Sequence, residues 1–258
     1  MNSQTRGSGL RFVSYNIRRC LGVDGVYSPD RIAAVLRECA ADVIALQEVD
    51  VGRLRSLGVD QAEVIGNRLG AASIHFHPAI AMESEHYGDA ILSMSSSRLV
   101  KAGLLPPGPS WRRKEPRGAL WVEIRTAGRK VQVFNTHLGL HRKERLAQAD
   151  ALLGPEWIAQ LKADDPLVLL GDFNSLPRGR VHSRLCARFT DAHHRAARGR
   201  PSPTFPTNRP LFRIDHIFCS PGIEVASAGA WRSACSRLAS DHYPVFADLE
   251  LGGAMTAI

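Results

Sequence analysis

Short apolar runs that stop at a polar side chain recur along this chain. The clearest is residues 167–170, a Leu-Val-Leu-Leu run typical of a strand buried on both faces, which Gly171 ends just before Asp172 and Asn174. Side chains two residues apart project to the same side of an extended chain, so this carboxylate and this amide should lie together. Burial of such groups is unfavourable unless they are paired or perform chemistry, which makes this strand end a candidate functional site.

The same patterns predict the remaining elements. We expect further strands, most with polar residues at or near one end, over residues 10–16, 42–48, 87–93, 119–125, 130–135, 213–218 and 245–251. Apolar residues at helical spacing predict helices over residues 29–39, 59–69 and 142–161, the last with an interruption at Gly154-Pro155. Two loops rich in proline and arginine are expected at 106–117 and 195–210.

The domain organisation follows from the even composition of the chain. No internal repeat, low-complexity linker or shift in composition divides the sequence. We therefore expect one α/β domain over residues 10–251, with flexible ends at 1–9 and 252–258. With 44% apolar residues, the 258-residue chain can form a substantial core.

The net charge is strongly positive. A charge of +8 and a pI near 9.7 indicate an anionic partner, such as nucleic acid, a phospholipid surface or a phosphate ester. The alternative is a solvated basic surface that reflects a general bias toward arginine. Charge alone does not decide between the two.

Targeting and redox signals favour the cytoplasm. The five cysteines are scattered without C-x-x-C spacing, which indicates neither a zinc site nor a disulfide framework. The first nine residues are polar, and no apolar run approaches the ~20 residues that a membrane-spanning helix needs. We expect a cytoplasmic monomer with reduced thiols and no membrane span.

The polar residues at the strand ends form a coherent chemical set. They are Asn16, Glu48, His137, Asp172, Asn174, Asp215, Asp241 and His242. Several carboxylates with an amide, and no zinc-type spacing, favour a hard cation, either Mg²⁺ or Mn²⁺. The histidines supply proton transfer and phosphate contacts, and an adjacent aspartate can orient one imidazole. This set suits metal-assisted hydrolysis of a phosphate ester. A Ser-His-Asp esterase is the rival, but the chain has no G-x-S-x-G motif.

The basic loop before residue 118 is a candidate substrate-binding segment. We expect Trp111, Arg112, Arg113 and Arg117 to contact an anionic or stacking substrate. The alternative is a solvated connection whose tryptophan packs locally.

Six short motifs in order make the chain resemble the endonuclease/exonuclease/phosphatase family, which includes deoxyribonuclease I, exonuclease III and neutral sphingomyelinase. They span nearly the whole chain: Ser14-Tyr15-Asn16, Leu46-Gln47-Glu48-Val49, Asn135-Thr136-His137-Leu138, Gly171-Asp172-Phe173-Asn174, Arg213-Ile214-Asp215-His216-Ile217 and Ser240-Asp241-His242-Tyr243-Pro244. The resemblance implies a four-layer α/β sandwich, in which two mixed sheets pack face to face with helices outside.

The resemblance also implies roles for the site residues. Glu48 would be the main metal ligand, helped by Asn16 and Asp241. Asn174 would hold a phosphoryl oxygen, and Asp172 would orient the attacking water or serve the leaving group. His242, held by Asp215, would be a base or a phosphate ligand, and His137 would stabilise charge on the phosphoryl oxygens. The assignment of the base to Asp172 or His242 stays open.

Two departures from the family pattern concern substrate contacts. Asp89 stands where many relatives have an asparagine, and Met94 stands where they have an arginine. We interpret the chain as a Mg²⁺-dependent phosphodiester hydrolase, nuclease-like in its substrate. The alternatives are a hydrolase of phospholipid headgroups or small phosphoesters and, from another class, a catalytically silent module that binds phosphate or nucleic acid.

Overall fold

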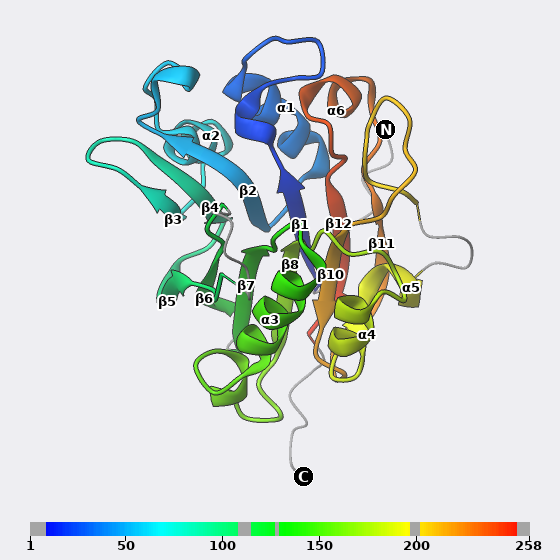
Figure 1. Ribbon diagram of the computed structural model, residues 1–258. Coiled ribbons are helices and arrows are strands. Elements are labelled where there is room, and N and C mark those ends of the chain that lie inside the picture. The colour runs from blue at the N-terminus through cyan, green and yellow to red at the C-terminus, as the bar shows by residue number, and fades with distance from the viewer. Residues whose placement is uncertain (1–8, 108–114, 127–128, 197–201, 252–258) are drawn as a thin grey trace.

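Two six-stranded mixed sheets face each other in the computed structural model, which describes residues 9–107, 115–126, 129–196 and 202–251 (Figure 1). The first sheet has the order β11-β12-β1-β2-β4-β3, with β1 (Leu10–Asn16), β2 (Val43–Val51), β3 (Ser73–Ala81), β4 (His86–Ser93), β11 (Glu224–Ala230) and β12 (Val245–Glu250). The second has the order β5-β6-β7-β8-β10-β9, with β5 (Ser97–Leu104), β6 (Gly118–Thr126), β7 (Arg129–His137), β8 (Leu167–Asp172), β9 (Thr190–Asp191) and β10 (Asp215–Cys219).

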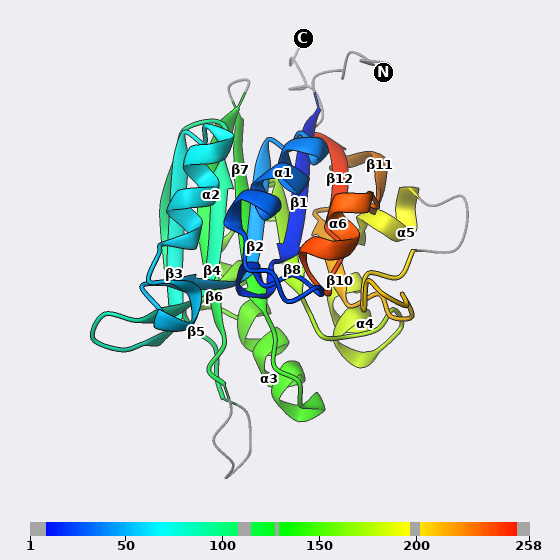
Figure 2. The same ribbon diagram turned by 90° about the horizontal axis from the view of Figure 1, so that it is seen from above.

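Helices cover the outer faces of both sheets (Figure 1), and Figure 2 looks onto those that cover the first sheet. Helices α1 (Pro29–Cys39), α2 (Gln61–Leu69) and α6 (Ala234–Ala239) pack on the first sheet, and α3 (Arg142–Leu153) and α4 (Arg180–Cys186) pack on the second. The short α5 (Ala192–Ala196) lies beside β11, and three 3₁₀ turns occupy Arg18–Cys20, Leu54–Ser56 and Ile158–Gln160. This arrangement confirms the predicted four-layer α/β sandwich.

The alternation of side chains along the strands builds three apolar layers. Phe12 packs between the two sheets, whereas its neighbour Val13 packs under α1 and α2. In β8, Val168 and Leu170 point between the sheets and Leu169 points toward α3 and α4. Both faces of the central strands are therefore apolar, which explains why they read as continuous hydrophobic runs.

Strand direction brings the polar strand ends to one edge of the sandwich. β1 and β2 are parallel, as are β7 and β8, and the partners β4, β10 and β12 run antiparallel to them. The last residues of β1, β2, β7 and β8 and the first residues of β4, β10 and β12 therefore meet at the same edge, here called the polar end. At the opposite edge, Leu10 of β1 pairs with Leu249 of β12.

The structure also defines elements that carried no prediction. The helix expected over residues 142–161 ends at Leu153, where Gly154 is its C-cap before Pro155, and a 3₁₀ turn follows. Edge strands β5 and β11 and the short helices α4, α5 and α6 carried no prediction. No helix among the described residues is long and apolar enough to cross a membrane.

Gly171 lets β7 and β8 approach closely just before Asp172. Its φ of 152° is a region that residues with a side chain rarely adopt, and a Cβ here would lie 1.9 Å from the carbonyl oxygen of Thr136. The clash falls on backbone, which cannot move without breaking the pairing between Thr136 and Gly171.

We predict that Gly171→Ala lowers the free energy of unfolding by about 2–4 kcal/mol, because strain and overpacking act together at a buried strand end. Urea unfolding of the two proteins measures the difference. Gly222→Ala is the matched control, since a Cβ there meets nothing within 4 Å. Equal stability of the Gly171 variant and wild type would contradict the predicted clash.

Candidate active site

Asp172 lies at the centre of the polar end. Its side chain is buried, and its Oδ1 accepts the backbone N–H of Asn174 at 2.9 Å. Its Oδ2 faces three groups from other strand ends: Asn16 Nδ2 at 3.2 Å, His137 Nε2 at 3.5 Å and His242 Nε2 at 3.8 Å. One carboxylate oxygen thus joins residues far apart in the sequence and contributed by both sheets.

Glu48 reaches the site because β2 is irregular there. Leu46 pairs with Ala90 and Val49 pairs with Gly88, so Gln47 and Glu48 together oppose the single residue between them. Glu48 takes a φ of 59°, which is uncommon for a residue with a side chain. The bulge turns the carboxylate toward Asn16, whose Nδ2 donates to Glu48 Oε1 at 3.0 Å.

Asn16 bridges two carboxylates. Its Nδ2 contacts both Glu48 and Asp172, and its Oδ1 accepts the backbone N–H of Arg18 at 3.0 Å. In this orientation the amide oxygen faces away from Glu48, so ligation of a metal through Oδ1 would need the amide to turn over. The role of Asn16 as a ligand stays a prediction, and the contacts describe a spacer between two negative charges.

Asp241 lies on the Asn16 side of the site. Ser240 Oγ donates to the carbonyl oxygen of Asn16 at 2.8 Å, which fixes the chain just before Asp241. The Asp241 carboxylate is about one third exposed and forms an ion pair with Arg18 Nε at 3.6 Å. It is therefore an accessible oxygen donor on the same flank as Glu48.

His242 is held in its charged form by the aspartate beside it. Its Nδ1 lies 3.1 and 3.0 Å from the two oxygens of Asp215, and Thr204 Oγ1 donates to Asp215 at 2.5 Å. Burial by itself would lower the pKa of His242, but Asp215, with help from Asp172 and Asp241, raises that pKa to about 10. The ring of Phe205 covers the imidazole at 4.7 Å.

His137 has the opposite electrostatic setting. Arg117 Nη1 lies 3.0 Å from its Nδ1, and because a guanidinium only donates, this ring nitrogen must accept. Burial, with the positive charges of Arg117 and His242, lowers the pKa of His137 well below its usual value. The ring is therefore neutral with its proton on Nε2, directed toward Asp172.

Asn174 is fixed at the rim of the site. Its φ is 48°, its Nδ2 donates to the carbonyl oxygen of Leu138 at 2.9 Å, and the same nitrogen lies 3.3 Å from His137 Nε2. The turn after β8 thus places the amide beside His137, while the backbone N–H of the same residue contacts Asp172.

The predicted substrate-binding residues are only partly described. Trp111, Arg112 and Arg113 lie outside the described residues. Arg117 is 8% exposed, and its charge is shared between His137 and Glu115, to which Nη1 forms an ion pair at 2.5 Å. Its guanidinium therefore contacts His137 and Glu115 rather than solvent.

Two residues at the site were not predicted to be part of it. Thr204 lies in the expected proline- and arginine-rich loop, and no sequence motif signals that its hydroxyl holds Asp215. Asp89 is buried within β4 opposite the bulge at Glu48, and burial, with Glu48 and Asp172 nearby, raises its pKa to about 8 despite Arg117. The sequence indicated Asp89 only through its acidic side chain, at a position where many relatives have an asparagine.

The assembled geometry has two chemically distinct flanks. Asn16 contacts Glu48 and Asp172 and adjoins the segment that carries Asp241, whereas the two imidazoles are the other groups that Asp172 Oδ2 faces. The oxygen-rich flank has the donors that a hard divalent cation requires. The histidine flank offers one cationic and one neutral donor, an arrangement suited to a tetrahedral anion.

Comparison with known proteins decides the family. The model of the endonuclease/exonuclease/phosphatase family matches residues 13–242, which include the site from Asn16 to His242. The chain belongs to this family.

Similar proteins cover nearly the whole chain. The uncharacterized protein YbhP of Escherichia coli (strain K12) is 29% identical over 97% of this chain and 100% of its own length. The crystal structure of an endonuclease/exonuclease/phosphatase from Beutenbergia cavernae has a TM-score of 0.78 at 26% identity, covering 96% of this chain and 73% of that one. A mannosyl-6-phosphatase of Bacteroides thetaiotaomicron has a TM-score of 0.73 at 22% identity, covering 93% of this chain and 99% of that one, and this likeness concerns the fold.

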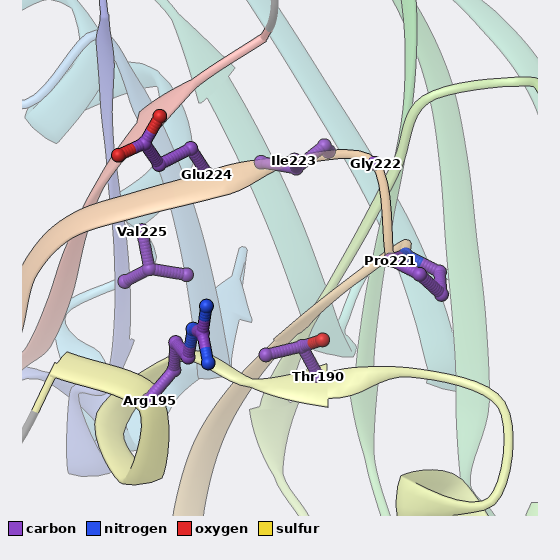
Figure 3. A pocket seen from close by; sticks show the side chains of 7 residues that line it. All are labelled: Thr190, Arg195, Pro221, Gly222, Ile223, Glu224 and Val225. Carbon is purple, nitrogen blue, oxygen red and sulfur yellow. The ribbon is translucent and has the colours of Figure 1, made fainter.

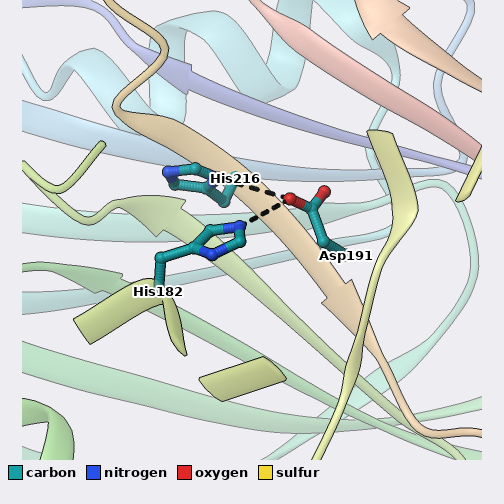
Figure 4. A group of neighbouring side chains, drawn as sticks. All are labelled: His182, Asp191 and His216. Atoms are coloured by element: carbon teal, nitrogen blue, oxygen red, sulfur yellow. Dashed lines mark hydrogen bonds and ion pairs between the residues drawn. The ribbon is translucent and has the colours of Figure 1, made fainter. Parts of the chain in front are cut away.

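A second group of polar side chains lies beneath the candidate active site. His182, Asp191 and His216 come together as Figure 4 shows, with His182 Nε2 2.8 Å and His216 Nδ1 4.0 Å from Asp191 Oδ2. Arg213 donates to both oxygens of Asp191, at 3.1 and 2.6 Å. Arg178 donates its backbone N–H to His182 Nδ1, which leaves the proton of the neutral ring on Nε2. The ring nitrogen facing Asp191 is thus a donor, and the group is a structural network rather than a metal centre.

His216 connects this network to the active site. Its Nε2 lies 2.8 Å from the carbonyl oxygen of Ser175, one residue after Asn174, so the ring holds the turn that carries the amide. A separate cavity of about 580 Å³ lies between α5 and the start of β11, at the end of β10 away from Asp215, and its lining includes Thr190, the neighbour of Asp191 (Figure 3). Among the described residues that line it, the charged ones are Arg195 and Glu224.

The buried His216 makes a specific pH prediction. Burial, with the charge of Arg213, lowers its pKa to about 3, so below the unfolded value of about 6.5 the unfolded chain binds a proton that the folded protein does not. Stability should therefore fall as the pH drops from about 6.5 toward 3. His216→Gln keeps a donor near the Ser175 carbonyl. Between about pH 7.5 and 5, its free energy of unfolding, measured with urea in metal-free buffer, should fall by about 2 kcal/mol less than that of wild type. Parallel losses in both proteins would contradict the assignment.

Proposed function

We propose that this protein is a Mg²⁺-dependent hydrolase of phosphodiesters. One observation carries the proposal: a buried carboxylate, Asp172, lies between two histidines, of which the surroundings hold His242 cationic and His137 neutral. A cationic donor and a neutral donor around a carboxylate provide sites for phosphoryl oxygens and for a proton in the same small volume. Membership of a family of hydrolases supports the same reaction class.

The oxygen-rich flank would hold the cation. Glu48 and Asp241 are its carboxylates, and Asn16 lies between Glu48 and Asp172. These donors fit Mg²⁺, or Mn²⁺, which shares the preference for oxygen. When bound, the cation supplies positive charge that polarises the phosphoryl group.

The histidine flank would position and protonate the substrate. His242, kept cationic by Asp215, would contact a phosphoryl oxygen and is a poor base near neutral pH. His137 would donate from Nε2, with its orientation set by Arg117. Asn174 would place a further N–H at the same anion.

Asp172 is the better candidate for the base. Burial and Asp215 raise its pKa, opposed by His242 and by the hydrogen bonds from Asn174 and Asn16. A carboxylate with a raised pKa accepts a proton from water more readily than an ordinary one, so Asp172 would take the proton of the attacking water. The proposal therefore assigns the base to Asp172 rather than to His242.

The nuclease-like substrate remains a prediction. It rested on Trp111, Arg112, Arg113 and the segment 195–200, most of which lie outside the described residues. The catalytically silent alternative leaves unexplained why Thr204, Asp215 and His242 form a hydrogen-bonded chain whose last ring nitrogen, His242 Nε2, faces Asp172 at 3.8 Å.

Glu48→Gln tests the metal. The substitution keeps the size of the side chain but removes a charged oxygen ligand, so hydrolysis of a chromogenic phosphodiester with Mg²⁺ should fall by about 10² or more. EDTA should abolish wild-type turnover, and added Mg²⁺ should restore it. Near-wild-type turnover of the variant at saturating Mg²⁺, with thermal unfolding unchanged, would remove Glu48 from the metal site.

Asp215→Asn tests the charge state of His242. Without this carboxylate, burial should lower the pKa of His242, so the variant should lose about 10²-fold in kcat at about pH 8 and recover part of it as the pH falls and the ring is protonated. Thr204→Val is the matched control, because it removes a hydrogen bond to Asp215 but keeps the charge. A pH–rate profile of the same shape in wild type and Asp215→Asn would rule out a cationic His242.

A further inference from the structure

Exposed large apolar side chains gather at the polar end. Among the described residues, every exposed large apolar side chain except Leu99 lies in a connection between strands at the polar end or, for Leu104, at the last residue of β5. They are Val23, Val26, Leu54, Leu57, Met82, Leu104, Leu140, Leu176, Leu211, Phe212 and Leu238. We call this set the apolar rim. Leu54, Leu57 and Leu140 are 83%, 76% and 75% exposed, so folding leaves them almost wholly in water. Large apolar surface concentrated on one face is a mark of an interaction site.

Cations without acidic partners lie among the same connections. The exposed basic residues that form no ion pair within the described part of the chain include five in these connections, and we call those five the cationic arc: Arg142, Lys143, Arg178, Arg180 and Arg209. Arg142 and Lys143 occupy the first turn of α3, where the helix dipole disfavours positive charge. Positive charge in this turn is unfavourable for the helix alone, which indicates that these two residues bind an anionic partner.

The rim and the arc meet beside the active site. A cavity of about 380 Å³ is lined by Arg142, Arg145 and Arg180 together with Leu176 and Phe212, and it reaches Asn174. Aliphatic and cationic side chains thus share one surface that leads to the proposed phosphate site.

We propose that the polar end docks on a bilayer surface that contains anionic phospholipid, with the catalytic site facing the headgroups. Aliphatic side chains that enter the headgroup region, next to basic residues that contact phosphates, are the features of an interfacial membrane site. The identity of the hydrolysed group rests on the proposed function, but the docking itself does not.

Other partners fit this surface less well. Single-stranded nucleic acid is bound mainly by aromatic stacking and cationic grooves, whereas the apolar rim contains one aromatic residue, Phe212, among aliphatic ones. A second copy of the chain would bring two cationic arcs face to face, which is electrostatically unfavourable. An anionic bilayer satisfies both the charge and the apolar area.

Flotation with vesicles tests the docking. Wild type should float with vesicles of phosphatidylcholine containing about one third phosphatidylglycerol, and much less with phosphatidylcholine alone. Leu54→Ser combined with Leu57→Ser and Leu140→Ser should reduce the partition coefficient about tenfold or more, because these side chains would be withdrawn from the apolar boundary. Leu99→Ser is the control, since Leu99 is exposed but lies on the edge strand β5.

A charge reversal tests the cationic arc. Arg142→Glu with Arg180→Glu should abolish the preference for anionic vesicles, whereas Arg125→Glu with Lys162→Glu makes the same charge change at the opposite end of the sheets and should preserve it. The rim variant is also assayed on a small chromogenic diester, where wild-type turnover shows that it is folded.

The outcomes separate docking from catalysis. No flotation of wild type, with normal diester hydrolysis, overturns the docking and leaves the proposed function intact. Flotation without any hydrolysis supports the docking and overturns the proposed function. Binding to DNA that falls by roughly 10² between about 50 and 200 mM salt, without flotation, would overturn the docking in favour of a nucleic acid.

Discussion

The burial of one carboxylate among other charges is the constraint on which the site depends. Asp172 is removed from water, yet Glu48, Asp215 and the cationic His242 lie around it, and charges in such a setting need partners. Residues from both sheets meet that need, since Asn16 and His242 come with the first sheet and His137 and Asp215 come with the second. Neither sheet alone could form the site, so its geometry depends on the packing of the two.

A second network beneath the site holds the turn that follows β8. Asp191 receives hydrogen bonds from Arg213 and His182, and its pKa is held well below the usual value even though burial would raise it. His216 extends from this network to the carbonyl of Ser175. The position of the active-site turn is therefore tied to the stability of a polar cluster that contains no catalytic group.

Much of this could be predicted from the sequence, for a physical reason. Buried apolar strands with Asn16, Asp172 or Asp215 at one end break the normal separation of apolar and charged residues, so they stand out in the pattern. Partnerships across the fold do not: the hydroxyl of Thr204 on Asp215 depends on how the chain returns to the polar end. Edge strands β5 and β11 are half exposed and lack clear alternation, which explains why they carried no prediction.

The sequence also did not predict which individual leucines are exposed. Leu140 follows a strand motif and Leu54 belongs to a short turn, and nothing in their local sequence distinguishes them from core residues. Their significance appears only when the connections of both sheets are seen to meet at one edge.

The pairing of Leu10 with Leu249 has a practical meaning. The beginning of the first strand and the end of the last one lie next to each other, on the side of the sandwich away from the active site. A reporter or surface anchor joined to either strand would leave the active-site face turned outward. A short peptide joining the two strands would close the chain into a ring, and new termini could then be opened in a surface loop such as the one at Gly222 without disturbing the residues around Asp172.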